Sequence, residues 1–265
     1  MRLTINVVAV GMLWMPMIGY ANTTFDNVRF VTGLSLGYSN FSFPEKLDQE
    51  INFPSLNVPL TLATEKWQVS ANLQTTLSDA DISEEEDVGK ASRDDIDLTI
   101  GYRISNNWTL FGGYRYGDTS IEFTPRDADS EDGLLAITNE TYEQKGPFIG
   151  ISYSWRFERA GILSFTTAYA LLDAKNDFSA NIDDDEEEGE LDEEIEFDDI
   201  TGRVTGDTQG FSYSVSWTMP VSSNLVFQTR FKVNDYQQDI LFNNMQFDGI
   251  DERFTSLHVG LAYVF

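Results

Sequence analysis

The sequence has no cysteine, a single histidine, and only 17 Lys and Arg residues against 44 Asp and Glu, so its formal net charge is −27. Without cysteine there are no disulfides, no thiolate metal sites and no cysteine nucleophile. The shortage of basic residues argues against a nucleic-acid partner, because a strongly acidic chain is repelled by the phosphate backbone. Clustered histidine ligands and phosphate-cradling motifs are also missing.

Long hydrophobic runs are absent except at the N-terminus. Arg2 precedes an apolar stretch over 5–18, and Gly19-Tyr20-Ala21 places small residues at the positions read by signal peptidase. This pattern predicts a signal peptide over 1–21 with cleavage after Ala21. The alternative is an N-terminal membrane anchor, but the run is shorter than the roughly 20 residues that a spanning helix needs.

The remaining chain, 22–265, alternates with a period of two. From Phe211 to Met219, large apolar residues occupy the odd positions and Ser or Thr the even ones, and 149–157 and 96–104 repeat the pattern. A hydrophobic fraction of 41% and a mean hydropathy of −0.28 are compatible with strands that show one face to lipid and the other to a wet interior.

Applying this alternation throughout predicts an all-β fold, a transmembrane antiparallel up-and-down β-barrel of about ten strands, with eight or twelve as alternatives. The strands are expected at 27–42, 54–63, 67–80, 94–105, 108–124, 142–157, 161–179, 206–220, 224–241 and 252–265. Short turns alternate with longer, mostly acidic loops, as in barrels with short periplasmic turns and long extracellular loops. The loops are expected at 43–53, 81–93, 125–141, 180–205 and 242–251.

The most acidic loop suggests a role for cations. It contains the run Asp183, Asp184, Asp185, Glu186, Glu187 and Glu188. Carboxylates bind hard divalent cations, but the run lacks the spacing of an EF-hand loop. We therefore expect no cofactor beyond weakly bound Ca²⁺ or Mg²⁺, which could also bridge the loop to lipopolysaccharide. The alternative is a solvated charge run that keeps the surface soluble.

The C-terminal strand carries a family resemblance. Its outward positions run through Leu257, Val259, Leu261 and Tyr263 to the terminal Phe265. This ending resembles the C-terminal signature of Gram-negative outer-membrane β-barrel proteins, and the chain as a whole is similar in pattern to the small porin-like ones. The resemblance implies an outer-membrane location and recognition of Leu261, Tyr263 and Phe265 by the barrel-assembly machinery.

Two enzyme classes need testing against this resemblance. Ten strands is also the size of the omptin proteases, whose chemistry uses acidic residues and a histidine near the extracellular rim. Here the single histidine, His258, lies about mid-strand, and its parity turns it towards the lumen. Outer-membrane lipases pair Ser with His, and the one G-x-S-x-G run in the sequence, Gly33-Leu-Ser-Leu-Gly37, lies inside the expected strand 27–42 and not at the strand-to-helix turn of a nucleophile elbow. We therefore expect no enzymatic activity and no catalytic residues.

The lumen is the remaining candidate site. Inward positions carry charged residues, namely Arg29, Asp95, Asp97, Arg103, Arg115, Arg156, Arg230, Lys232 and His258. Charges inside a barrel must pair or stay wet, and ten strands is close to the size that side chains fill. A plugged or very narrow lumen is therefore favoured over a conducting channel. The expected function is a porin-like barrel with slow small-solute passage or a surface-loop role, and the alternative is a structural or adhesion module. The oligomeric state stays open.

Overall fold

The structure, a computed structural model, describes residues 28–43, 49–84, 87–124, 136–158, 160–181, 200–242 and 245–265. These residues form eleven strands and no helix. The strands are β1 (Arg29–Phe43), β2 (Gln49–Ala63), β3 (Trp67–Thr76), β4 (Ala80–Glu84), β5 (Asp87–Arg103), β6 (Trp108–Thr124), β7 (Ala136–Phe157), β8 (Gly161–Asn181), β9 (Ile200–Pro220), β10 (Leu225–Phe242) and β11 (Met245–Val264).

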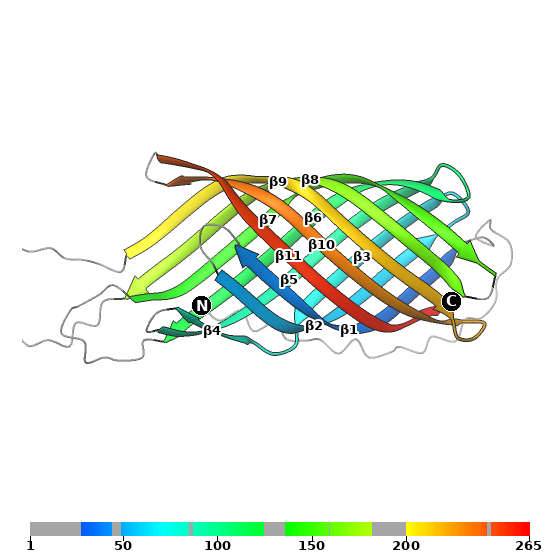
Figure 1. Ribbon diagram of the computed structural model, residues 1–265, viewed down its shortest axis with the longest axis horizontal. Helices are drawn as coiled ribbons and strands as arrows, with labels where there is room; N and C mark the ends of the chain where they lie inside the picture. The colour runs from blue at the N-terminus through cyan, green and yellow to red at the C-terminus, as the bar shows by residue number, and fades with distance from the viewer. Residues whose placement is uncertain are drawn as a thin grey trace, which may run out of the picture.

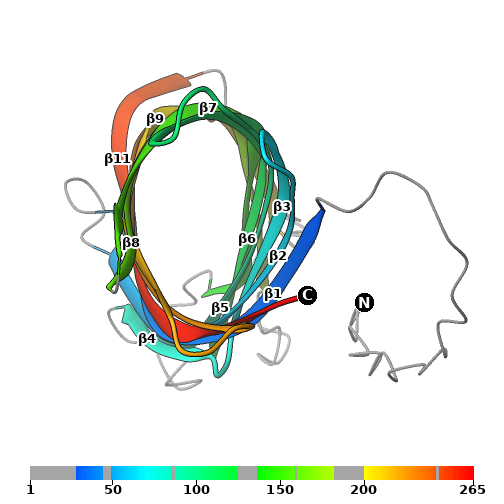
Figure 2. The same ribbon diagram turned by 90° about the vertical axis from the view of Figure 1, so that its right-hand side faces the viewer.

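The sheet closes into an antiparallel up-and-down barrel with ten strands in its wall (Figures 1 and 2). Strands that are consecutive in the chain pair, except that β3 pairs with β5 and not with β4. β1 pairs with β11 from Val31↔Val264 to Ser42↔Arg253. The short β4 continues the row of β3, because both pair with β5 and only 77–79 separate them. The expected fold class is confirmed, and closure leaves no free sheet edge in the wall.

The two ends of the barrel differ. At one end, here called the turn end, the strands reverse through the short segments 64–66, 104–107, 158–160 and 221–224, and the chain terminus at Phe265 lies there too (Figure 1). At the other, here called the loop end, the connections at 44–48, 85–86, 125–135, 182–199 and 243–244 depart. The turns lie where the sequence predicted them, but the connections at 85–86 and 243–244 are much shorter than the expected loops 81–93 and 242–251, because the neighbouring strands extend into them.

Nearer the turn end, the outer face of the wall is an apolar band. Large exposed apolar side chains come from every strand of the wall; they include Leu36, Leu62, Val69, Ile100, Leu110, Ile149, Phe165, Tyr213, Phe231 and Leu261. Aromatic residues gather beside the turns, where Trp67 packs on Tyr102 at 4.8 Å and Trp108 packs on Tyr153 at 4.7 Å between ring centroids. An apolar belt with aromatic residues at its margin is the surface that lipid requires of a barrel.

Towards the loop end, the strands extend further than the sequence indicated. In this extension the outer face of the wall becomes polar and the inner face becomes apolar. Residues 49–53, 81–84, 87–93, 136–141, 200–205 and 245–251 were expected in loops but belong to strands. In this extension most charged side chains face outward and most apolar ones inward, and the buried Arg93 and Glu252 are exceptions. Lys90 is outward beside buried Ala91, and Arg253 is outward beside buried Phe254. Acidic composition thus marks an outer surface in water, and not only a loop.

Within the described ranges, no helix has the length and apolar character needed to cross a membrane. The expected signal peptide at 1–21 and the acidic run from Asp183 to Glu188 lie outside these ranges.

Candidate functional site: the barrel lumen

An apolar cluster fills the lumen near the loop end. It is called the apolar plug and consists of Phe41, Ile51, Phe53, Ala80, Ile82, Ala91, Ile121, Tyr142, Ala174 and Phe254. These buried side chains come from eight of the strands. The rings of Phe41 and Tyr142 meet at 5.9 Å although β1 and β7 lie on opposite sides of the ten-strand ring. Their contact therefore crosses the lumen.

A buried arginine links the plug to a polar layer. The guanidinium carbon of Arg93 lies 4.8 Å from the ring centroids of both Phe41 and Phe254, a cation–π arrangement. Its Nε and Nη2 donate to Asp95 at 2.9–3.2 Å, and its Nη1 donates to Thr119 at 2.9 Å. The charge of Arg93 is thus neutralised by Asp95 and covered by two phenyl rings.

A second polar group joins β7 to β11 beside the plug. The hydroxyl of Tyr142 donates to Glu252 Oε2 at 2.7 Å, and the amide of Gln144 donates to the Tyr142 oxygen at 2.6 Å. Glu252 is 1% exposed, and burial raises the pKa of its carboxyl above the ordinary value, although Arg93 opposes that shift. The cluster lies in the extension, beyond the apolar band.

Nearer mid-barrel, Asp97 joins two cations. It accepts from Arg115 Nε at 2.6 Å and Nη2 at 3.1 Å, a bidentate pair, and from Lys232 Nζ at 3.0 Å. Lys232 on β10 lies across the lumen from Asp97 on β5. Arg115 also donates to Tyr236, whose hydroxyl lies 2.8 Å from that of Ser212. Bidentate pairing of this kind fixes geometry as well as charge.

The single histidine is enclosed by hydroxyl and amide groups. His258 is 3% exposed, and its Nε2 lies 2.9 Å from Ser55 Oγ. Ser55 contacts Ser39 at 2.9 Å, and Gln74 donates to Ser39 at 3.2 Å. No described carboxylate forms a hydrogen bond or ion pair with His258, and Ser55 is 0% exposed. Both side chains of the Ser55–His258 pair are therefore buried in the lumen.

Between this charged layer and the turn end lies a polar cavity of about 400 Å³. Hydroxyl-bearing residues line much of it, namely Ser70, Thr99, Thr109, Ser152, Ser154, Ser164, Thr166, Ser212, Ser214, Ser216 and Thr218. Asp97, Arg115, Arg230 and Lys232 also line it. Along β3 the inward residues change from buried Gln74 to half-buried Asn72 and exposed Gln68. The cavity is therefore open at the turn end and blind towards the plug.

The other residues singled out from the sequence lie elsewhere. Arg29, Arg103 and Arg156 are exposed, each near the turn-end limit of its strand. Leu261, Tyr263 and Phe265 point outward, and Phe265 contacts Phe30 at 5.4 Å. No cluster of three or more His, Asp or Glu residues suited to a metal occurs among the described residues.

Several lumen residues were missed by reasoning from sequence. Arg93 fell within the expected loop 81–93 and so was not given a face. Tyr142 and Glu252 lie at the first positions of expected strands, where parity could have placed them inward. Ser55 had no distinguishing signal, because its partner His258 is 203 residues away.

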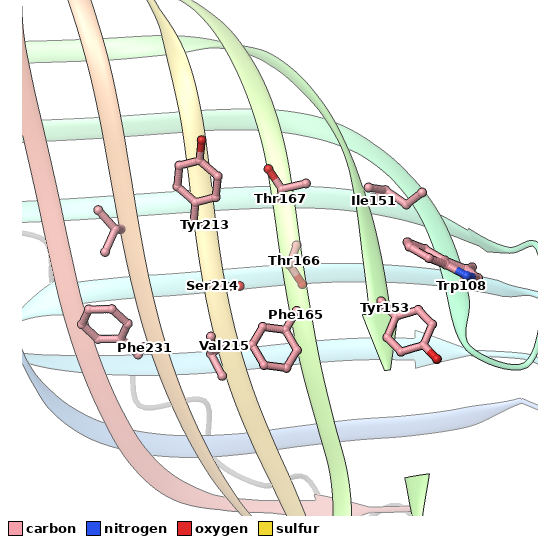
Figure 3. Close-up of a pocket in the computed structure, with 11 residues that line it drawn as sticks. Trp108, Ile151, Tyr153, Phe165, Thr166, Thr167, Tyr213, Ser214, Val215 and Phe231 are labelled. Carbon is pink, nitrogen blue, oxygen red and sulfur yellow. The ribbon is translucent and has the colours of Figure 1, made fainter. Parts of the chain in front are cut away.

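A separate hollow lies on the outside of the wall (Figure 3). It measures about 420 Å³ and spans β6 to β10, with apolar side chains such as Ile151, Phe165, Val215 and Phe231. Because these residues belong to the apolar band, the hollow faces the lipid side. It is not a continuation of the lumen.

No family model matches the chain, and no curated protein matches it. Among solved structures, the outer membrane protease OmpT from Escherichia coli matches with a TM-score of 0.54 and 14% identity, covering 93% of this chain and 99% of that one. The beta domain of the Bordetella autotransporter BrkA matches with a TM-score of 0.48 and 10% identity, covering 91% and 100%. The translocator domain of autotransporter NalP from Neisseria meningitidis gives 0.46 and 13%, covering 91% and 89%.

At these identities the likeness concerns the fold. The match to OmpT covers nearly all of both chains, and no activity follows from it. The closed ten-strand wall, its apolar band and the likeness to OmpT together identify the fold as that of an outer-membrane β-barrel.

Proposed function

We propose that this protein is a non-enzymatic outer-membrane barrel, porin-like in build, whose own side chains close the lumen. It resides in the outer membrane with the turn end in the periplasm and the loop end outside. Its role lies at the cell surface or in slow passage of small solutes. The observation that carries the proposal is the apolar plug with its cross-lumen contact between Phe41 and Tyr142.

The layers below the plug support closure. Asp97 ties Arg115 to Lys232 across the barrel, and Tyr142 ties β7 to Glu252 on β11. A side chain that leaves such a network exposes a buried charge or polar atom, which costs several kcal/mol, about 3–5 for a broken buried ion pair. Spontaneous opening wide enough for a large solute is therefore rare.

The absence of enzymatic activity is argued from the histidine. A hydrolase at the cell surface needs its base within reach of substrate. His258 is buried in the lumen and is bonded to Ser55, with the plug between it and the loop end. The geometry supports a structural role for this pair.

Planar-bilayer recording of the purified protein tests the closed lumen. We expect no sustained conductance steps from the natural protein. The double variant Phe41→Ala with Phe254→Ala removes both rings that cover Arg93 and should give measurable steps. Phe231→Ala removes a ring from the lipid-facing side and serves as the matched control, with the behaviour of the natural protein expected. Large, stable steps from the natural protein would refute the closed lumen.

A surface role is favoured by the extension itself. Its outer face carries exposed ion pairs, including Lys145–Glu143, Arg203–Asp177 and Arg253–Asp235. Exposed pairs add little stability, so their density indicates a wall built to stand in water and hold the connections away from the membrane. An adhesion or structural module would use such a platform.

Weak binding of Ca²⁺ or Mg²⁺ by the acidic run, with bridging to lipopolysaccharide, belongs to the same proposal. Limited proteolysis tests it on the intact protein. Millimolar Ca²⁺ should slow cleavage within 182–200, and an unchanged rate would exclude cation binding there. Loss of cell-surface binding on deletion of this loop, with a silent bilayer, would favour the surface role over solute passage.

A further inference from the structure

The polar cavity at the turn end has an uneven charge balance. Arg115, Arg230 and Lys232 line it with only one carboxylate, that of Asp97. The neighbouring Arg93 is already paired with Asp95 at 2.9 Å and does not line the cavity. In a chain with a net charge of −27, a cavity with excess positive charge calls for an explanation.

Arg230 is the unmatched cation. Asp97 is engaged by Arg115 through both carboxylate oxygens and by Lys232. Arg230 forms no hydrogen bond or ion pair with any described residue, and its Nε is buried without a partner. A guanidinium in a partly desolvated site needs an anion or water to satisfy it. Among the described residues that line the cavity, none supplies a second carboxylate for this purpose.

The surroundings of Arg230 suit an oxygen-rich ligand. Arg230 pairs in register with Ser216, and Lys232 pairs with Ser214, so two cations and two hydroxyls share one patch of the wall. Arg115 faces the same cavity from β6. Such donors, from several directions, match the oxygens of a phosphate group better than the two oxygens of a carboxylate.

Access and size agree with this chemistry. The cavity is open at the turn end, where Arg29, Arg103 and Arg156 are exposed. Positive groups along an entrance raise the local concentration of anions. A volume of about 400 Å³ lies within the range of small-molecule pockets and exceeds what one phosphate ion fills.

We propose that the turn-end cavity is a binding site for a phosphate group, carried by inorganic phosphate or by a small phosphorylated solute, with Arg230 as its main anchor. The inference goes beyond the proposed function. It requires the cavity but not a closed plug, so bilayer recording and ligand binding can fail independently.

Calorimetric titration of the purified, folded barrel in detergent tests the proposal. Inorganic phosphate and glycerol 3-phosphate are the probes, and chloride at matched ionic strength is the control for screening. We expect saturable binding of at least one phosphate probe and none of chloride. Arg230→Gln should weaken it by about tenfold or more, as for loss of a charge-assisted contact. Arg253→Gln, at an exposed ion pair outside the lumen, should leave it unchanged.

A second variant keeps the proposal testable if Arg230→Gln does not fold. Ser216→Asp places a carboxylate opposite Arg230 in the register. It should abolish phosphate binding and raise the unfolding temperature in phosphate-free buffer, because it supplies the missing counter-charge. Tighter binding of glycerol 3-phosphate would assign the site to a phosphorylated solute, and tighter binding of phosphate to the free ion. Binding that is absent, equal with chloride or unchanged in both variants would overturn the proposal.

Discussion

At the scale of single residues, glycine sets how closely the lumen can pack. Gly37 is the register partner of His258, and a Cβ at position 37 would lie 2.6 Å from His258 Cδ2 and 2.1 Å from the carbonyl oxygen of Leu257. Neither atom is the far end of a flexible chain. The hydrogen-bonded row from His258 through Ser55 to Ser39 therefore depends on the absence of a side chain at position 37.

Gly37→Ala should destabilise the barrel. Overpacking at a buried site costs about 1–3 kcal/mol, and we expect a loss of that size in the free energy of unfolding by guanidinium, followed by tryptophan fluorescence. Gly112→Ala is the control, because its Cβ would meet only Phe148 O, at 3.4 Å. Equal stability of both variants would show that the His258 side chain can move to admit the Cβ without a loss in the free energy of unfolding.

Glu252 predicts a pH dependence at the same scale. Burial raises its pKa, so the folded protein holds this proton more tightly than the unfolded chain does. The contribution of protonated Glu252 to folding stability is complete at a pH below its pKa in the unfolded chain, about 4.5. It is lost as the pH rises through its pKa in the folded protein. Glu252→Gln should match the natural protein at low pH and exceed its unfolding temperature increasingly as the pH rises.

Glu143 should show the opposite sign. A hydrogen bond from Lys145 is the main cause that lowers the pKa of Glu143, so its stabilisation is present above about 4.5 and lost as the pH falls. Glu143→Gln should therefore be less stable than the natural protein at neutral pH and equal to it in acid. Heat-modified mobility on gels, measured across the pH range, checks both variants. The same trend in both would contradict the assignment.

At the scale of the strand, the outward-facing residues of a single strand contact lipid over one part of its length and water over the other. On β7, Ile149 is an outward residue within the apolar band, whereas Lys145 and Glu143 are outward residues beyond it. Side-chain parity does not change along the strand, but the exchange of apolar and charged faces marks where lipid gives way to water. The position of this exchange can be measured.

A lysine scan along β7 locates that border. Ile149→Lys should cost about 2–4 kcal/mol in lipid vesicles, and Thr141→Lys about 0–1, the values for lipid-facing and interfacial positions. Reversible unfolding from vesicles by guanidinium gives both numbers. Similar costs at both positions would mean that the membrane extends over the proposed extension.

The change of the outer face from apolar to charged also explains which strand residues could be predicted from the sequence. Within the band, segments such as 211–219 alternate so plainly that strand, face and barrel follow from the pattern. In 87–93 the pattern reads Asp-Val-Gly-Lys-Ala-Ser-Arg, where charge and glycine indicate a loop, yet residues 88–93 pair with β6. Pairing there is set by the closed wall and by Ala91 in the plug, which local composition does not reveal.

The lumen shows the corresponding limit for the site. Parity could turn Asp97, Arg115 and Lys232 inward, but it could not indicate which groups meet. That depends on the stagger of strands around the ring, since Lys232 and Asp97 are 135 residues apart. The unmatched state of Arg230 is likewise a property of the assembled barrel and of no segment alone.

At the scale of the whole molecule, closure joins the first strand to the last. β1 and β11 pair along twelve residue positions, the amide of Phe265 donates to the carbonyl of Phe30 at 2.8 Å, and their rings meet at 5.4 Å. Phe265 thus has a structural contact at the seam. The C-terminal resemblance implies a second role, as a residue read by the assembly machinery.

Deletion of Phe265 separates these two roles. An aromatic pair contributes about 0.5–1.5 kcal/mol beyond its buried area, so the shortened chain should still fold into vesicles, with a modest loss in the free energy of unfolding. If assembly in cells reads Phe265, the level of folded protein in the outer membrane should fall far more than that loss explains. Phe265→Tyr keeps the ring and should restore both measures. A cellular defect no larger than the one in vesicles would leave Phe265 with its seam contact alone, because stability would then account for the whole effect.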